Sequence, residues 1–160
     1  MASAIVYLTG DATAPTAPGP KIIAHIVNDA GRWGRGFVTA ISRRWPVPEQ
    51  RYRQWHRDRA DNDFALGAVQ LIAVDDELHV ANMVGQHGIR TARTATAPIR
   101  YDALDHCLIH LATAATDLGA TVHMPRIGTG LAGGTWNRVE PLLVDRLIGH
   151  GVAVTIYDLP

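Results

Sequence analysis

Along this chain, short apolar runs alternate with longer segments in which apolar residues recur every three or four positions. The apolar runs are typical of strands and lie at residues 4–8, 21–27, 68–74, 78–83, 121–124 and 152–157. The helical periodicity predicts helices at residues 37–44, 48–59, 99–118 and 136–148, with Gly119 as the C-cap of the third helix. Because helices and strands alternate, the sequence predicts an α/β sandwich.

Length and composition favour one compact unit. The chain has 160 residues, of which 47% are hydrophobic, and this suits a single domain over residues 1–160. Its formal net charge is zero, so overall charge does not support general binding to nucleic acid or membranes. No run approaches the ~20 apolar residues of a membrane span, and the first residues lack the basic start of a signal peptide. We therefore expect a cytoplasmic monomer, with the single cysteine, Cys107, buried on a helix face.

The most informative stretch is a glycine-rich loop that joins the run at 121–124 to the helix at 136–148. Its glycines are Gly128, Gly130, Gly133 and Gly134. Glycine lets successive backbone N–H groups converge on a phosphate, and the following helix N-terminus adds unsatisfied donors and a partial positive charge. A strand, such a loop and a helix in this order favour an anion site, although many glycine-rich loops are only turns.

A second loop of the same kind follows the apolar run at 21–27. Residues 28–36 hold three glycines and lead into the helix at 37–44. In open α/β sheets, ligands lie outside the carboxyl ends of the strands, so two such loops side by side would clamp a diphosphate. A carboxylate, Asp11, follows the first strand and suits a hydrogen-bond donor at the other end of the ligand, such as an exocyclic amine.

Three segments carry a family resemblance. They are Gly10-Asp11, then His25-Ile26-Val27-Asn28-Asp29 with Arg32-Trp33-Gly34-Arg35-Gly36, then Met124-Pro125-Arg126-Ile127-Gly128-Thr129-Gly130-Leu131. In this order they resemble a macrodomain, and most closely the subclass with the terminal ADP-ribose protein glycohydrolase and the DNA-linked ADP-ribose hydrolases of bacterial toxin–antitoxin pairs. The resemblance runs from about residue 8 to residue 157. It implies a three-layer sandwich with a central mixed sheet between helices, and ADP-ribose as ligand or substrate without a cofactor.

The resemblance also implies roles for individual residues. Asp11 would accept a hydrogen bond from the adenine amino group, Ala12 would lend a backbone N–H, Asn28 would lie near the distal ribose and Tyr157 along the adenine. The two loops and their neighbours complete the expected substrate-binding set: Arg32, Trp33, Gly34, Arg35, Gly36, Phe37, Gly85, Arg126, Ile127, Gly128, Thr129, Gly130, Leu131 and Ala132.

Four of these residues have simpler interpretations. Asp11 could cap the turn at Gly10, and Asn28 could be a satisfied turn residue. Tyr157 could be a strand aromatic with its hydroxyl in water, and Trp33 could pack on the core rather than form a wall of the site.

The sequence departs from the subclass at the catalytic centre. The subclass has an aspartate directly after its Gly-x-Gly-Leu, where this chain has Ala132, and a lysine near the end of the central strand, where this chain has none. We therefore expect a substrate-assisted reaction in which Gln86, His87 and Asp29 are the catalytic candidates. His87 is the best-matched acid, because histidine titrates near neutral pH. The alternatives are an exposed loop histidine for His87, within a polar loop at 85–98, and a cap or a partner of Arg32 for Asp29.

The remaining histidines and arginines give weaker signals. His25 and His123 fall within apolar runs and are expected in the core. His106 and His110 have metal-ligand spacing on one helix, but no third ligand is evident, so no metal site is expected. Residues 32–59 hold eight arginines against two acidic residues, with Trp45, Tyr52 and Trp55 between them. This pattern suits either a nucleic-acid interface or a solvated helix face.

Three classes of function fit these residues. The first is a hydrolase of ADP-ribosyl linkages, on protein glutamate or aspartate esters, thymidine-linked ADP-ribose on DNA, or O-acyl-ADP-ribose. The second is a non-catalytic reader of ADP-ribose, and the third is an ADP-ribose 1″-phosphate phosphatase. In each, the partner is ADP-ribose or an ADP-ribosylated protein or DNA. We expect the hydrolase.

Overall fold

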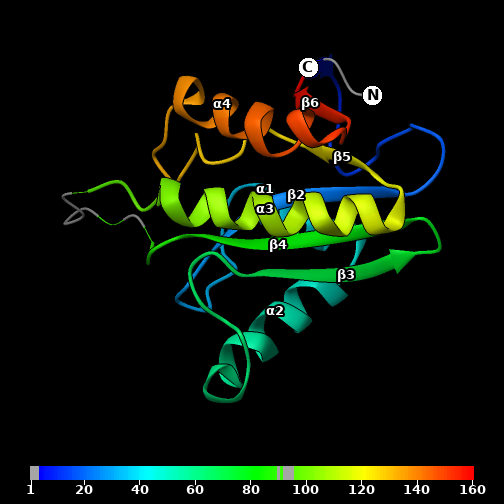
Figure 1. Ribbon diagram of the computed structural model, residues 1–160. Helices are drawn as coiled ribbons and strands as arrows, with labels where there is room; N and C mark the ends of the chain where they lie inside the picture. The colour runs from blue at the N-terminus through cyan, green and yellow to red at the C-terminus, as the bar shows by residue number, and fades with distance from the viewer. Residues whose placement is uncertain (1–3, 90, 92–95) are drawn as a thin grey trace.

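A central sheet lies between two layers of helices in the computed structural model, which describes residues 4–89, 91 and 96–160 (Figure 1). The described residues form six strands in the spatial order β1 (Val6–Thr9), β6 (Val154–Asp158), β5 (Thr121–Met124), β2 (Lys21–Asn28), β4 (Leu78–Gln86) and β3 (Val69–Asp75). Neighbouring strands are parallel, except that β3 runs antiparallel to β4. The predicted mixed sheet is confirmed.

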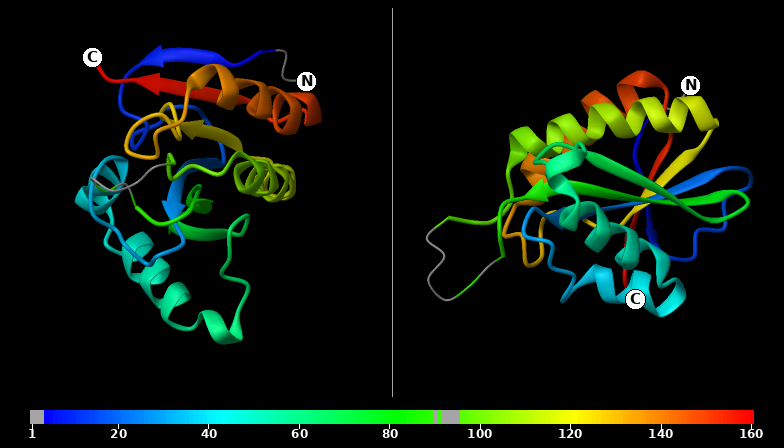
Figure 2. Two further views of the ribbon diagram at one scale, coloured as in Figure 1. Left: turned by 90° about the vertical axis from the view of Figure 1, so that its left-hand side faces the viewer. Right: turned by 90° about the horizontal axis from the view of Figure 1, so that it is seen from below.

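Two pairs of helices cover the sheet. Helices α1 (Phe37–Arg44) and α2 (Val47–Arg57) lie on one side, and α3 (Tyr101–Leu118) and α4 (Trp136–Arg146) lie on the other, as the left view of Figure 2 shows. Short 3-10 turns, η1 (Arg59–Asp61) and η2 (Ile148–His150), follow α2 and α4. The predicted three-layer sandwich is therefore confirmed.

The sequence of β2 shows how one strand serves both layers. Ile22 and Ala24 pack in the cluster beneath α3 and α4, whereas Ile23 and Val27 pack in the cluster beneath α1 and α2. Successive side chains of a strand point to opposite faces, so a strand buried on both faces must be apolar throughout. This explains why the sequence of β2 from Ile22 to Val27 is apolar except at His25.

Several predicted boundaries move by one to three residues. Strand β4 continues to Gln86 instead of stopping at residue 83, because Gln86 pairs with Asn28 of β2 and bridges to Ile99. The predicted loop at 85–98 therefore begins two residues later, and residues 90 and 92–95 of it lie outside the described residues. Helix α4 stops at Arg146, before η2. Gly119 has a φ of 62° and is confirmed as the left-handed C-cap of α3.

The topology brings five chain segments to the same end of the sheet, where the carboxyl ends of the parallel strands lie. The parallel strands are β1, β6, β5, β2 and β4, and the segment that follows each of them begins at this end. Strands β2 and β5 are direct neighbours, so the two glycine-rich loops lie side by side as predicted. In the part of the chain that the structure describes, no helix is both long and apolar enough to cross a lipid bilayer.

Candidate functional site

A crevice of about 280 Å³ opens between the two glycine-rich loops. Its walls come from β2, the start of α1, the end of β4 and the loop after β5. The lining residues are His25, Ile26, Arg35, Gly36, Phe37, Val38, Gln86, Pro125, Arg126, Ile127, Gly128, Thr129, Gly130, Leu131 and Ala132. The structure thus brings together most of the predicted loop residues and one predicted catalytic residue, Gln86. The remaining predicted site residues lie around this crevice rather than in its lining.

The loop after β5 is held in a tight turn by contacts that only glycine permits. Gly128 has a φ of 77°, and a Cβ on it would lie 2.5 Å from Cδ1 of Ile99. A Cβ on Gly134 would lie 2.6 Å from the Gly128 carbonyl oxygen, which accepts the N–H of Gly134 at 2.7 Å. Because backbone packs against backbone, the loop keeps one shape along the crevice wall.

The loop after β2 is fastened by Asn28 and Tyr52. The Asn28 amide donates to the Arg32 carbonyl at 2.8 Å, and its oxygen accepts the N–H groups of Ala30 and Arg32. The buried Tyr52 hydroxyl donates to the Asn28 carbonyl at 2.6 Å. Asn28 is therefore the satisfied turn residue of the simpler interpretation, and its amide holds the loop instead of facing the crevice.

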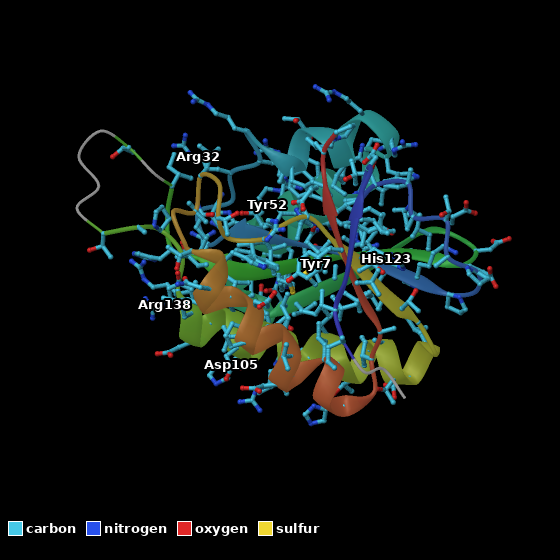
Figure 3. All side chains as sticks on the ribbon, turned by 90° about the horizontal axis from the view of Figure 1, so that it is seen from above. Tyr7, Arg32, Tyr52, Asp105, His123 and Arg138 are labelled. Atoms are coloured by element: carbon cyan, nitrogen blue, oxygen red, sulfur yellow. The ribbon has the colours of Figure 1, made fainter. Side chains whose placement is uncertain are left out.

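Trp33 is also a structural residue of this loop. It is buried in the cluster beneath α1 and α2, and its indole N–H donates to the Ser42 hydroxyl at 2.7 Å. Its ring meets that of His25 edge to face, with 5.4 Å between centroids. Trp33 supports the wall from behind and does not line the crevice. Gly34 precedes the lining residues, and Arg32 is exposed at the end of the molecule where the loop after β5 lies (Figure 3).

The N-terminus of α1 points a set of backbone donors at the crevice. Gly36, with a φ of 80°, occupies the N-cap position, and Phe37 and Val38 of the first turn line the crevice. The first turn has no acidic residue, and no described side chain caps it. Unsatisfied N–H groups and the helix dipole at such an end favour an anion.

The predicted adenine residues have local partners in the structure. One Asp11 oxygen accepts from the Thr13 N–H and hydroxyl, at 2.8 and 2.7 Å, and the other lies 3.2 Å from the Arg44 guanidinium. These hydrogen bonds, led by that from the Thr13 hydroxyl, lower the pKa of Asp11. Asp11 thus caps its turn, and about half of its side chain stays exposed to a ligand. Ala12 is buried beside it.

The simpler interpretation of Tyr157, with its hydroxyl in water, is wrong. The hydroxyl lies 2.7 Å from Nδ1 of the buried His123 and so is not in water. Its ring borders Gly10, where a Cβ would lie 3.6 Å from Cδ2 of Tyr157. The ring is therefore fixed beside the segment that carries Asp11, and the expected contact with adenine stays a prediction.

Arg126 lines the crevice, but its charge is already matched. Its guanidinium makes two hydrogen bonds to Asp158, at 2.7 and 3.0 Å, and this pairing lowers the pKa of Asp158. It also lies about 5 Å from the ring centroids of Tyr7 and Trp136, and Figure 3 shows Tyr7 on β1 beside β6. Arg126 ties the start of the loop to β6, and its expected part in substrate binding stays a prediction.

The catalytic candidates form one hydrogen-bonded group on the rim. Nδ1 of His87 lies 2.7 Å from an Asp29 oxygen, whose second oxygen accepts the N–H of Gly88 at 2.7 Å. The Gln86 amide donates to the Gly88 carbonyl at 3.0 Å. Asp29 is thus paired with His87 rather than with Arg32. The His87 side chain is 62% exposed and free to meet a substrate at the crevice mouth.

Comparison with known proteins decides the family. No protein-family model matches the chain. A macrodomain protein from Streptomyces coelicolor is 57% identical, with a TM-score of 0.86, and the match covers 96% of this chain and 98% of that one. This chain belongs to the macrodomain family. The macrodomain of DarG from Mycobacterium tuberculosis is 25% identical, with a TM-score of 0.76 and 96% coverage of both chains. The resemblance drawn from the sequence is confirmed.

Two further relatives are a much longer chromodomain-helicase protein and a phosphatase of similar length. Mouse chromodomain-helicase-DNA-binding protein 1-like is 34% identical over 167 residues, which cover 99% of this macrodomain but 18% of the mouse protein. This chain therefore spans less than a fifth of that relative. An ADP-ribose 1″-phosphate phosphatase from Lodderomyces elongisporus is 26% identical, with 96% of this chain and 99% of that one covered.

This macrodomain has no carboxylate where the resembled subclass has its aspartate. Ala132 is 7% exposed, and its carbonyl accepts the N–H of Ile99 at 3.0 Å. Gly85, expected in a loop, is a β4 residue; a Cβ on it would lie 3.4 Å from Ile26, and it does not line the crevice. The described residues at this position therefore supply no acid or base like that of the resembled subclass.

One residue of the crevice wall, His25, was not expected there from the sequence. His25 is 2% exposed, as expected for a core residue, but it is also one of the residues that line the crevice. Its Nε2 is hydrogen-bonded to Oδ1 of Asn82, whereas Nδ1 is buried without a partner among the described residues. Burial lowers the pKa of His25 to about 4, so the ring is neutral. A polar residue within the otherwise apolar run at 21–27 was the available signal.

The other predicted histidines and the cysteine lie elsewhere in the macrodomain. His123 is buried, as expected, and Cys107 is fully buried, which raises the pKa of its thiol to about 12. His106 and His110 line a separate hollow between α3 and the segment before β3. No three His, Cys, Asp or Glu side chains within residues 4–89, 91 and 96–160 converge as metal ligands.

The arginine-rich region forms the outer surface of the α1–α2 layer. Seven of its eight arginines are exposed, and Arg53 is half-buried beside Glu49. The aromatic part of the predicted nucleic-acid pattern is wrong, because Tyr52 and Trp55 are buried in the core and cannot stack on bases. The arginines themselves form a basic surface next to the crevice, where Arg35 is part of the lining.

Proposed function

We propose that this macrodomain binds ADP-ribose in the crevice and hydrolyses ADP-ribosyl linkages. The observation that carries the proposal is the convergence of two glycine-rich loops and the α1 N-terminus on one crevice. These groups offer backbone donors from both sides to a diphosphate. The half-exposed Asp11 and the ring of Tyr157 lie beyond one end, and the His87–Asp29 pair lies at the other. A phosphatase acting on ADP-ribose 1″-phosphate among the relatives supports this ligand class.

The reaction requires water to attack the anomeric carbon while the bond from that carbon to the leaving group breaks. Position 132 is an alanine, so no aspartate is available there to accept a proton from this water. Instead, the diphosphate of the substrate, held at a bend, orients the water and accepts its proton. His87 donates a proton to the leaving group, and Asp29 fixes the tautomer and direction of the ring. Alignment of water and substrate lowers the barrier without a lysine nucleophile.

The test is release of ADP-ribose from a glutamate-ADP-ribosylated protein and from a thymidine-ADP-ribosylated oligonucleotide, beside phosphate release from ADP-ribose 1″-phosphate. We expect turnover of a glycosidic or ester linkage, and a loss of about 10²–10⁴-fold in His87→Ala. Phosphate release alone would make the protein a phosphatase. Calorimetric binding of ADP-ribose without any turnover would make it a reader, and no binding at millimolar ADP-ribose would overturn the site.

Among the linkages, the basic surface favours ADP-ribose attached to DNA. The arginines of the α1–α2 layer border the crevice through Arg35 and can neutralise a phosphate backbone on either side of a modified nucleotide. We therefore place the thymidine-linked substrate ahead of the protein ester. A higher kcat/KM for the glutamate-linked protein than for the oligonucleotide would reverse this order.

A further inference from the structure

A series of hydrogen-bonded polar side chains crosses three strands, from the half-buried Gln70 to the buried His25 at the crevice. His25 of β2 lies opposite Asn82 of β4, which in turn lies opposite Gln70 of β3. Asn82 is fully buried and donates through Nδ2 to Oε1 of Gln70 at 3.1 Å, and Gln70 donates to the Arg51 carbonyl at 3.0 Å. The three residues lie on the α1–α2 face of the sheet, between the apolar residues of that core.

Two backbone carbonyls, those of Arg51 and Pro48, fix which group donates in every hydrogen bond of this series. The carbonyls of Arg51 and Pro48 can only accept, so Gln70 and Asn82 must turn their NH₂ groups toward them. Asn82 must therefore turn Oδ1 toward His25, and Nε2 of His25 must carry the proton of that bond. In a neutral ring this leaves Nδ1 as a bare acceptor.

The bare nitrogen belongs to a residue that lines the crevice. His25 is one of the lining residues, and Nε2 of its ring is turned to Asn82, so Nδ1 is the only polar side-chain atom that His25 has left for a ligand there. Nδ1 is closed to bulk water and lacks a partner among the described residues. An unsatisfied buried acceptor is costly, and a donor brought by a ligand would remove that cost.

We propose that Nδ1 of His25 accepts a hydrogen bond from a ribose hydroxyl of bound ADP-ribose, which makes His25 a residue that selects for ribose next to the diphosphate. This inference rests on the proposed function for the identity of the ligand. An ionised phosphate has no proton to give to Nδ1, and the adenine amino group is expected at Asp11, so the ribose hydroxyls are the remaining donors of this ligand.

The test is long-range ¹H–¹⁵N NMR of the histidine rings in the wild-type protein, with His25→Phe to assign the His25 signals. We expect the free protein to show the neutral Nε2–H tautomer for His25. Saturation with ADP-ribose should move its unprotonated nitrogen upfield, as acceptance of a hydrogen bond does. Repeating the titration with ADP identifies the ribose: a shift with both ligands indicates the adenosine ribose, and a shift with ADP-ribose alone indicates the distal one.

Binding to His25→Phe gives the second measurement. Calorimetry should show about tenfold weaker affinity for each ligand that shifts the nitrogen, with an unchanged fold by circular dichroism. Cys107→Ala, which opens a small cavity in the opposite core, controls for lost stability. Binding of ADP-ribose without a shift of Nδ1, or an Nδ1–H tautomer, overturns the inference and leaves the proposed function intact. Absence of ADP-ribose binding to the wild type overturns both.

Discussion

Two glycines of the loop after β5, Gly128 and Gly130, should differ in how much they matter for the stability of this macrodomain. Gly128 has a positive φ and no room for a Cβ, whereas a Cβ on Gly130 would meet nothing within 4 Å. We expect Gly128→Ala to lower the free energy of unfolding by about 2–4 kcal/mol through strain and overpacking. Gly130→Ala should change it by less than about 0.5 kcal/mol. Urea denaturation of both variants measures this difference.

Gly130 also provides a test of the anion site. Gly130→Glu places a carboxylate at the crevice wall and should abolish binding of ADP-ribose while the protein stays folded, because like charges repel in a site built for a diphosphate. Calorimetry with Gly130→Ala as the control separates charge from bulk. Retained affinity in Gly130→Glu would place the diphosphate elsewhere.

The two buried histidines predict loss of stability in mild acid. Burial lowers the pKa of His25 and of His123 to about 4, whereas both titrate near 6.5 in the unfolded chain. Between pH 6.5 and pH 4 these histidines bind protons in the unfolded state but stay neutral in the folded state. The free energy of unfolding therefore falls as the pH drops from 6.5 toward 4. Each histidine contributes on the order of 3 kcal/mol to this loss.

Denaturant titrations at pH 7.5, 6 and 5 measure the effect. His25→Phe and His123→Phe should each flatten the pH dependence, although both are less stable than the wild type at pH 7.5. The carboxyl of Asp11, whose pKa is lowered, acts in the same direction but only near and below pH 4, outside this range. A stability that does not change between pH 7.5 and 5 would show that the rings are charged or exposed.

At the scale of elements, helix α2 controls the loop after β2 through one hydroxyl. Tyr52 is fully buried and donates to Asn28, whose amide in turn orders the loop. Tyr52→Phe leaves the Asn28 carbonyl without this donor and should cost about 1–2 kcal/mol. The amides of Ala30 and Arg32, which donate to the Asn28 side chain, should exchange faster with deuterium, while those of β5 should not. Unchanged exchange at both amides would contradict this control.

Elements with a strong local pattern could be predicted from the sequence, and contacts made across the sheet could not. The bounds of α1 and β5 are those predicted, because a glycine-rich loop on one side and a proline or turn on the other define them. Strand β4 runs past its predicted end because Gln86 pairs with a distant strand, which local polarity does not reveal. For the same reason, the burial of Tyr52 and Trp55 was hidden within an arginine-rich segment.

The candidate site shows the same division. The sequence motifs located the crevice loops, since glycines and a helix start are adjacent along the chain. The ion pair of Arg126 with Asp158 and the pair of His87 with Asp29 join residues 32 and 58 positions apart. The motif alone therefore indicated no partner for Arg126 and left His87 and Asp29 as two separate catalytic candidates. Their real partners depend on which strands are neighbours in the sheet.

For the whole molecule, zero net charge conceals a strong separation of charge. Residues 32–59 carry eight arginines and two acidic residues, whereas the rest of the chain has seven basic and thirteen acidic residues. One layer is therefore positive by six formal charges, and the remainder is negative by six. Within about a Debye length of the surface, a polyanion interacts with the charge of the nearest layer and not with the net charge of the whole molecule.

This separation predicts how salt affects the proposed activity. The kcat/KM for a thymidine-ADP-ribosylated oligonucleotide should fall steeply as salt rises from 50 to 200 mM, because arginines on the α1–α2 layer displace counterions from the strand. Activity on ADP-ribose 1″-phosphate, or affinity for free ADP-ribose, should depend far less on salt. In Arg43→Glu/Arg57→Glu, the oligonucleotide reaction should slow by at least tenfold and its logarithmic salt slope should shrink by about 1–2. Arg138→Glu makes the same kind of charge change on α4, in the opposite layer, and should leave that slope unaltered. Equal slopes in all three proteins would mean that the basic layer is a solvated surface and that the crevice alone selects the substrate.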